Sequence, residues 1–177
     1  MRNAVCVFVL CFSFQLAAQT PAQPAKPGPE LERLHVFLGK WTNQGAALAS
    51  PYGPAGTITA AETFEWLPGG FFMIHKAEGH QGTTEVKWVE IIGYDVRKKI
   101  YTTHTFDNFG NSVLWEGTWS ENTLTWTADS YVAGKSLKER CPINTGSPNK
   151  LAVKCEYSID GGAKWQLNVE TTLTRVK

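Results

Sequence analysis

The sequence feature that most constrains the fold is a series of short runs in which apolar and polar residues alternate, filling the chain from residue 57 to residue 176. Tight-turn sequences such as Pro68-Gly69-Gly70 and Asp160-Gly161-Gly162 separate these runs. Alternation puts one set of side chains on each face of a strand, and a glycine-rich turn brings the next strand back antiparallel. With Trp41 opening the first strand, the pattern predicts about ten strands spaced roughly 8–12 residues apart.

Most of these strands can be placed from the pattern alone. We expect strands at 57–66, 71–78, 86–95, 100–106, 113–119, 124–126, 131–140, 151–157 and 165–176. Two stretches rich in glycine, alanine or proline, residues 45–56 and 141–149, are expected to be loops.

A long antiparallel meander leaves unpaired backbone groups on its first and last strands, and closing into a barrel removes both edges. The predicted fold class is therefore all-β, an antiparallel up-and-down barrel of about ten strands. A barrel of this size encloses either a packed core or one cavity for a small ligand. A two-sheet sandwich is the alternative.

One short helix is predicted before the strands. Pro29 and Glu30 suit a first helical turn, and the leucines at 31, 34 and 38 have the spacing of one apolar face. So short a helix is not stable alone, so its leucines should cover an open end of the barrel. Gly39 then lets the backbone turn tightly into Trp41.

The N-terminus has the order of a secretory signal peptide. Arg2 precedes an apolar run from Val5 to Phe14, which is too short to span a bilayer, and the small pair Ala17-Ala18 follows. We expect residues 1–18 to be a signal peptide, residues 19–29 a proline-rich leader, and residues 30–177 the barrel domain. A buried first strand or helix is the alternative. The mature protein is expected to be soluble, without a membrane span, and periplasmic or secreted.

Cys141 and Cys155 are the two cysteines that remain after removal of the signal peptide. In an oxidising compartment a disulfide between them is the simplest interpretation. The alternatives are free thiols or half of a metal site, but neither a second cysteine pair nor a nearby histidine completes a zinc site.

The charge balance argues against two classes of partner. The formal net charge is +1, and loss of Arg2 with the signal peptide brings it to about zero. Arg97-Lys98-Lys99 falls in an expected turn and is interpreted as a solvated loop. We therefore expect no nucleic-acid or anionic-membrane partner. Oligomeric state is left open.

Four motifs in the same order resemble a known family. They are Leu-Gly-Lys-Trp at 38–41, Trp-Leu-Pro-Gly-Gly-Phe-Phe at 66–72, Gly-Tyr-Asp at 93–95 and an arginine at 175. In this order they resemble the secreted bacterial DUF1579 family, which is itself similar to the calycins, including lipocalins and fatty-acid-binding proteins. The resemblance implies a lipocalin-like barrel and brings no established activity.

The resemblance also implies structural roles for two residues. In calycins the corresponding tryptophan packs beneath an arginine of the last strand, so Trp41 and Arg175 are expected to join the first and last strands. A guanidinium over an indole ring contributes about 0.5–2 kcal/mol. Nitrobindins, haem proteins of similar fold, use a histidine near the C-terminus, whereas this chain has none after His104. No cofactor is therefore expected.

Seven tryptophans suggest that rings line the barrel interior. Our first hypothesis is a binding protein for a small hydrophobic or amphipathic ligand, and the candidate lining residues are Met73, His75, Trp88, His104 and Trp115. With Glu62, Glu90 and Glu116, the two histidines could form a polar patch. The alternative is a structural or partner-binding domain in which the aromatic side chains fill the core and leave no cavity.

The second hypothesis is a small enzyme in which His75 or His104 acts as general base. The sequence has no Gly-X-Ser-X-Gly elbow, no reactive-cysteine signature and no phosphate-binding glycine loop before a helix. It also has no His-Glu-X-X-His or His-X-His spacing for a metal. No catalytic or metal-ligating residue is therefore predicted, and an enzyme is the less favoured interpretation.

Overall fold

The computed structural model describes residues 26–132 and 134–177. The expected signal peptide, with Cys6 and Cys11, and most of the proline-rich leader lie outside the described residues. Within the described part of the chain, no helix has the length and apolar character needed to cross a membrane.

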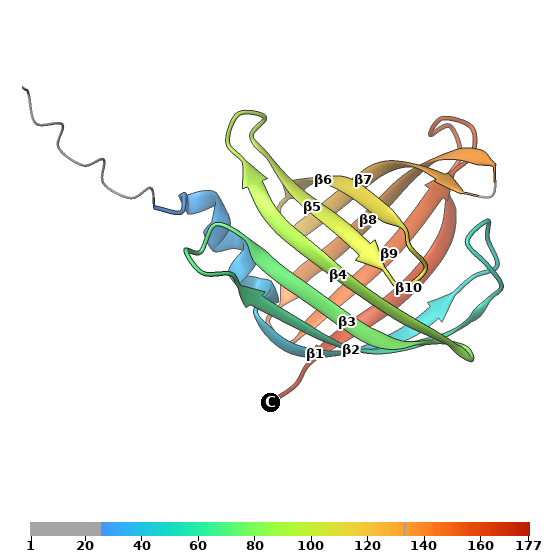
Figure 1. Ribbon diagram of the computed structural model, residues 1–177, viewed down its shortest axis with the longest axis horizontal. Helices are drawn as coiled ribbons and strands as arrows, with labels where there is room; N and C mark the ends of the chain where they lie inside the picture. Colours follow the sequence, from blue (N-terminus) through green and yellow to red (C-terminus); the bar gives the residue numbers. More distant parts are fainter. Residues whose placement is uncertain (1–25, 133) are drawn as a thin grey trace, which may run out of the picture.

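The described chain consists of a 3₁₀ helix, η1 (Pro29–Phe37), and ten strands. The strands are β1 (Gly39–Ala47), β2 (Gly56–Trp66), β3 (Met73–Gln81), β4 (Thr84–Asp95), β5 (Ile100–Asp107), β6 (Ser112–Ser120), β7 (Thr123–Val132), β8 (Lys135–Ser147), β9 (Lys150–Ser158) and β10 (Gln166–Arg175). Each strand pairs antiparallel with the next in sequence, and β10 pairs with β1 (Figure 1). The predicted closed barrel is confirmed, and the alternative of two open sheets is excluded.

The seam between β1 and β10 is held by more than backbone hydrogen bonds. Trp41 and Arg175 are directly opposite in register, and the guanidinium carbon lies 4.1 Å from the centre of the indole ring. The same guanidinium donates hydrogen bonds to the carbonyl oxygens of Leu38 and Val36. Arg175 therefore links the last strand both to the first strand and to the end of η1.

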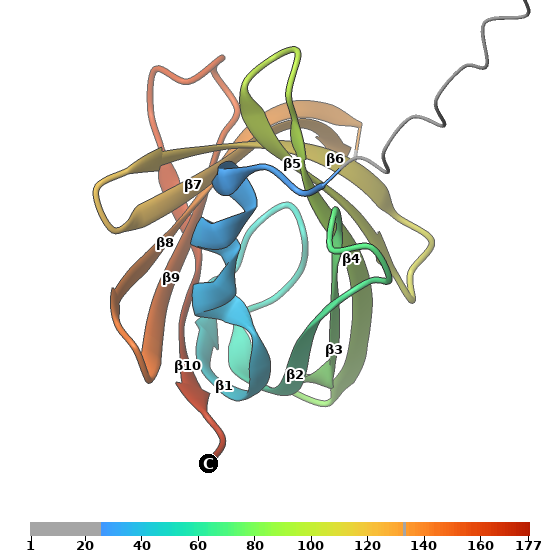
Figure 2. The same cartoon turned by 90° about the vertical axis from the view of Figure 1, so that its left-hand side faces the viewer.

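Helix η1 lies across one end of the barrel (Figure 2). Its buried residues are Leu31, Leu34 and Phe37, at a spacing of three. The sequence pattern predicted an apolar face through Leu38 instead, which assumes 3.6 residues per turn. A 3₁₀ helix has three residues per turn, so Phe37 takes the inward position and Leu38 is only partly buried.

The β7–β8 hairpin differs from the prediction. The expected strand at 131–140 is broken by a turn, where Gly134 has φ +80°, a conformation that glycine adopts readily. The expected loop at 141–149 is largely the second half of β8. Pro142 suggested a loop because it cannot donate a ladder hydrogen bond. Pairing along both neighbouring strands nevertheless keeps β8 extended through Pro142, which lies opposite Thr125.

Cys141 and Cys155 form a disulfide between β8 and β9. Their Cα atoms are 4.1 Å apart, and the neighbouring pair Arg140 and Glu156 is in direct register. The predicted disulfide is therefore confirmed, and the structure shows that it crosses between adjacent strands and lines the cavity.

Removal of this disulfide is expected to lower the free energy of unfolding by about 3 kcal/mol, because it closes a loop of about 15 residues in the unfolded chain. Urea unfolding of the wild type and of Cys141→Ala/Cys155→Ala measures the difference. An unchanged midpoint would contradict a stabilising role.

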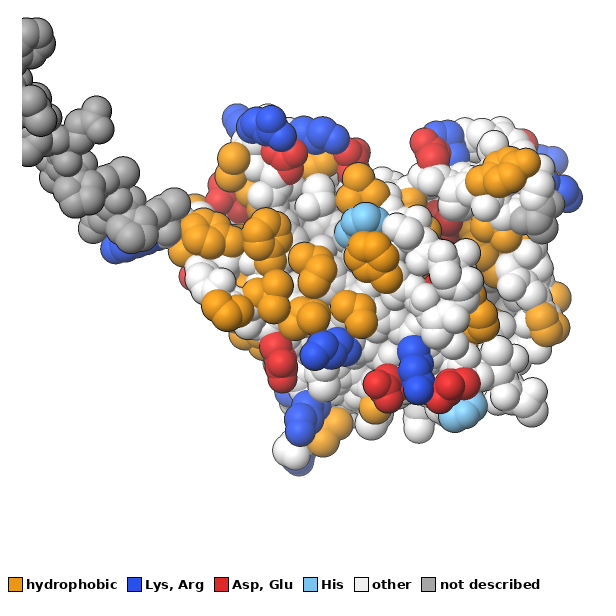
Figure 3. Space-filling model, viewed as in Figure 1, with side chains coloured by type: hydrophobic (Ala, Val, Ile, Leu, Met, Phe, Trp, Pro, Cys, Tyr) orange, Lys and Arg blue, Asp and Glu red, His pale blue; other side chains and the backbone are white. Residues whose placement is uncertain are grey.

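The outer face of β3 to β6 carries apolar side chains that solvent reaches. Val89 and Phe106 are opposite each other on β4 and β5, and Leu114 on β6 is 59% exposed. Phe72, just before β3, is 50% exposed. Hydrophobic side chains gather on this side of the molecule in Figure 3. We call these four residues the apolar outer face.

Candidate functional site

The barrel encloses a cavity of about 410 Å³, within the usual range of small-molecule sites. It extends from Phe37 of η1 to Asp107 and Phe109 at the β5–β6 turn. Its apolar lining consists of the disulfide and the residues Phe37, Ile58, Phe64, Val86, Trp88, Phe109, Trp115, Trp126, Ile143, Leu151, Val153, Val169 and Leu173. The interior is therefore mostly apolar and is not filled by side chains.

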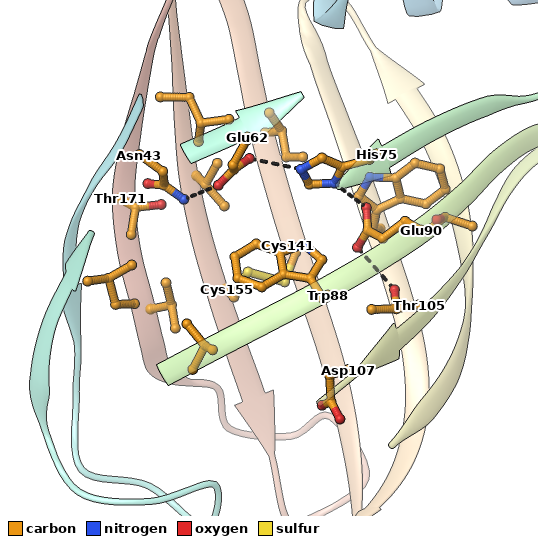
Figure 4. A pocket seen from close by; sticks show the side chains of 18 of the residues that line it. Asn43, Glu62, His75, Trp88, Glu90, Thr105, Asp107, Cys141, Cys155 and Thr171 are labelled. Carbon is orange, nitrogen blue, oxygen red and sulfur yellow. Dashed lines mark hydrogen bonds and ion pairs between the residues drawn. A yellow bond between two sulfur atoms is a disulfide. The ribbon is translucent and has the colours of Figure 1, made fainter. Parts of the chain in front are cut away.

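A chain of polar side chains crosses this apolar interior (Figure 4). Asn43 Nδ2 donates to Glu62 Oε1 at 2.6 Å, and Glu62 Oε2 is 3.0 Å from His75 Nε2. The other ring nitrogen, His75 Nδ1, is 2.8 Å from Glu90 Oε2, and Thr105 Oγ1 donates to Glu90 Oε1 at 3.0 Å. One histidine is thus held between two carboxylates, and each carboxylate is fixed by a neutral donor.

Barrel register is what assembles this chain. His75 on β3 is directly opposite Glu90 on β4, and Glu90 is directly opposite Thr105 on β5. Directly opposite residues on antiparallel strands have their side chains on the same face and close together. Glu62 on β2 and Asn43 on β1 continue the line inside the barrel, so five consecutive strands each supply one member.

His75 is protonated in this site. Ionised carboxylates only accept hydrogen bonds, so both ring nitrogens must donate to Glu62 and Glu90. Burial alone would lower the pKa of His75, but the hydrogen bonds to Glu62 and Glu90 outweigh it and raise the pKa to about 9. The ring also stacks on Phe64, with centroids 3.8 Å apart, and meets Trp88 edge-on at 6.0 Å. The packing therefore holds the imidazolium in one orientation.

The protonation of His75 predicts that stability falls at alkaline pH. Its pKa rises on folding from 6.5 to about 9, so its contribution is complete below pH 6.5 and declines above it. The contribution is lost once the pH passes about 9, and it amounts to about 3 kcal/mol. Urea unfolding from pH 6 to pH 10 should show this decline in the wild type and in His80→Leu, a variant at an exposed position of β3. The decline should be absent from His75→Leu.

The structure separates the five candidate lining residues. His75, Trp88 and Trp115 line the cavity. Met73 does not: it is fully buried in the core cluster that also contains the buried residues of η1. His104 points outward, where its Nε2 is 2.8 Å from Ser112 Oγ.

The polar patch expected around the two histidines is also half right. Glu62 and Glu90 meet His75, whereas Glu116 lies outside the barrel and pairs with Lys98 at 2.8 Å. The error has one physical cause, the parity of positions along a strand. On β5 the odd-numbered residues face inward, so His104 and every even-numbered residue face out.

Several polar residues of the cavity were missed from the sequence, and three of them matter most for its chemistry. Asn43, Thr103 and Thr105 line it, and none belongs to a recognisable motif. Parity could have identified the two threonines, since Tyr101 is an inward aromatic residue and positions 103 and 105 share its face. Asn43 could have been identified in the same way from Trp41, which shares its face of β1.

The polar chain is not arranged as a metal centre. Across the residues that the structure describes, no group of three or more histidine, cysteine, aspartate or glutamate side chains could hold a metal ion. Both nitrogens of His75 are already used by Glu62 and Glu90. The arrangement instead provides a buried, hydrogen-bonded charged group at one side of an apolar cavity.

Comparisons with solved structures give the same fold. Rv2717c from M. tuberculosis superposes with a TM-score of 0.62 at 14% identity, covering 86% of this chain and 100% of that one. The S-type phycobiliprotein lyase CPES from Guillardia theta superposes with a TM-score of 0.55 at 10% identity, covering 82% and 92%. At these identities the likeness establishes the fold alone.

Comparisons of sequence are more specific about ancestry. No curated protein matches the chain. A family model described as a protein of unknown function, DUF1579, matches residues 26–175, which include η1 and all ten strands of the barrel. The chain therefore belongs to the DUF1579 family.

Proposed function

We propose that the protein binds a small hydrophobic or amphipathic molecule inside the barrel. The observation that carries this proposal is the cavity of about 410 Å³, lined mainly by apolar and aromatic side chains and crossed by a few fixed polar groups. That combination is typical of small-molecule sites, in which apolar walls supply affinity and placed polar groups supply orientation. His75, Trp88 and Trp115 are proposed as ligand contacts.

Two other functions are less well supported by the same site. A general base needs a free lone pair, and both nitrogens of His75 already donate to carboxylates, while His104 lies outside the cavity. A purely structural domain would be expected to have a filled core, because empty space in an interior lowers stability. Ligand binding explains both the space and the polar groups within it.

The cavity can be tested with a matched pair of substitutions on β4. Val86 lines the cavity, whereas Val89 belongs to the apolar outer face. Val86→Trp should block binding of the neutral dye N-phenyl-1-naphthylamine, and Val89→Trp should not. Dye fluorescence gives the affinity, and circular dichroism establishes that both variants are folded.

The natural ligand can be sought in parallel. Mass spectrometry of the protein purified under native conditions should detect a co-purified small molecule in the wild type and in Val89→Trp, at reduced occupancy in Val86→Trp. If neither the dye nor any co-purified molecule binds the wild type, the proposed function is wrong. Equal binding by the two tryptophan variants would place the ligand outside the barrel.

The proposed compartment is outside the cytoplasm, periplasmic or secreted. The disulfide between Cys141 and Cys155 is compatible with an oxidising environment. Cleavage after Ala18 would leave the leader 19–29 and the domain 30–177. N-terminal sequencing of the exported protein tests this, and a mature chain that still begins at Met1 would contradict it.

A partner-binding domain is the second candidate, and the apolar outer face favours it. Isolated monomers seldom expose several large apolar side chains side by side. The partner to test is a second copy of this chain, since an apolar face can pack against the same face of another copy about a twofold axis. Light scattering should then show a dimer that Leu114→Lys dissociates, while a monomeric wild type at high concentration would exclude this role.

A further inference from the structure

The polar chain ends in an acceptor that has no donor. Asn43 is 7% exposed and lines the cavity, and its Oδ1 has no hydrogen-bond partner. The amide cannot be turned round at no cost, because Nδ2 donates to Glu62 Oε1, and a flipped amide would place an oxygen against that carboxylate. Asn43 Oδ1 is therefore a fixed, buried acceptor.

A second buried polar atom in the cavity also has no hydrogen-bond partner. Thr103 is 2% exposed, lines the cavity and has no hydrogen-bond partner for its Oγ1. Buried polar atoms are almost always paired, because an unpaired one loses the hydrogen bonds it had in water. Two such atoms in one cavity indicate places for polar groups that a ligand brings. Asn43 Oδ1 can only accept and so requires a donor, whereas the Thr103 hydroxyl can donate or accept.

The charge of the cavity indicates that the donating ligand group is positively charged. Glu62 and Glu90 are two carboxylates, and His75 supplies one positive charge, so the group carries a net negative charge. Among the lining residues that the structure describes, Lys87 is the single lysine or arginine, and its Nζ is 3.0 Å from Glu85 Oε1. A buried net charge without a counter-charge is unfavourable, so a cationic ligand group would offset it.

We propose that the cavity binds a small apolar molecule carrying one protonated amine, with the ammonium group at Asn43 Oδ1 and the adjoining carboxylate of Glu62. This rests on the proposed ligand-binding function and names the chemical class. An ammonium has three N–H donors, enough for Asn43 Oδ1 and a carboxylate oxygen of Glu62. The apolar body would lie against the tryptophans on the cavity wall, Trp88, Trp115 and Trp126.

The proposal ranks ligands that share one skeleton. An alcohol could satisfy one acceptor but would leave the net charge unbalanced. A carboxylate would bring a second negative charge beside Glu62 and Glu90. The expected order of affinity is therefore amine, then alcohol, then carboxylate.

Three naphthalene probes test this order at pH 7 by isothermal titration calorimetry: 2-(1-naphthyl)ethylamine, 2-(1-naphthyl)ethanol and 1-naphthylacetate. Since a hydrogen bond to a charged group is stronger than a neutral one, the amine should bind about 10- to 100-fold more tightly than the alcohol. An alcohol that binds as tightly as the amine, or a carboxylate that binds most tightly, overturns the proposal and leaves ligand binding intact.

A matched pair of variants on β1 locates the contact. Asn43→Leu is close in size and removes Oδ1 from the cavity, whereas Thr42→Val alters the neighbouring, exposed position. Asn43→Leu should weaken amine binding by about 5- to 10-fold, as expected for loss of one hydrogen bond, and Thr42→Val should not. Unchanged amine binding by Asn43→Leu overturns the proposed contact. If the neutral dye N-phenyl-1-naphthylamine binds the wild type but 2-(1-naphthyl)ethylamine does not, the proposal of a protonated-amine ligand is wrong. If neither binds and no molecule co-purifies, ligand binding itself is wrong.

Discussion

Trp41→Ala is expected to lower the free energy of unfolding by about 3–5 kcal/mol, the cost of truncating a large buried aromatic residue. Trp41 is 1% exposed, and its Nε1 donates to the carbonyl oxygen of Phe37 at 2.6 Å. The substitution would also remove the ring on which Arg175 lies. Because these contacts join η1, β1 and β10, the loss falls at the point where the barrel closes. Urea unfolding followed by circular dichroism measures it.

Leu114→Ala is the control, because it removes an apolar side chain that is largely exposed. Its effect should be within about 0.5 kcal/mol. A loss of less than about 1 kcal/mol for Trp41→Ala, well under the usual cost of a large cavity, would mean that the seam does not depend on this residue.

His75→Leu should cost about 3–5 kcal/mol at pH 7, because removing one partner of a buried ion pair leaves the remaining charges uncompensated. Glu62 is 3% exposed and would lose its contact with the imidazolium, and so would Glu90. His80→Leu, on an exposed position of the same strand, is the matched control and should change stability by about 0.5 kcal/mol or less.

A rescue variant separates loss of charge balance from loss of packing. Glu62→Gln/His75→Leu/Glu90→Gln removes both carboxylates together with the imidazolium and should recover part of the stability lost in His75→Leu. Urea unfolding of the three proteins at pH 7 gives the comparison. If the triple variant is less stable than His75→Leu, the carboxylates contribute something other than charge, and the proposed role of His75 as their counter-charge is wrong.

Much of the fold could be predicted from the sequence because strands and turns depend mainly on residues that are close together in the chain. Alternation along a run and glycine in the turns predict strands and hairpins, and a long meander predicts closure. The exceptions are places where neighbours overrule local preference. Pro142 lies within a strand because β7 and β9 pair on either side of it, and Phe37 replaces Leu38 as an inward residue because η1 has three residues per turn.

The candidate site was only partly predictable for a different reason. Alternate residues of a strand face in and out, so an error of one residue in the predicted register reverses the side on which every side chain lies. His75 was therefore placed correctly in the interior, whereas His104 was placed on the wrong side. Nothing near Asn43 in the sequence indicates that it will donate to Glu62, because that contact exists only when β1 and β2 curve into the same wall.

The sequence by itself determined an antiparallel barrel with a short helix before it and a cysteine pair suited to a disulfide, since these follow from patterns along the chain. Only the tertiary structure decided that five strands each contribute one side chain to a buried polar chain, and that Asn43 Oδ1 and Thr103 Oγ1 have no hydrogen-bond partner. Hydrogen-bond satisfaction and net charge inside a cavity are properties of side chains from different strands, and barrel closure is what brings them together.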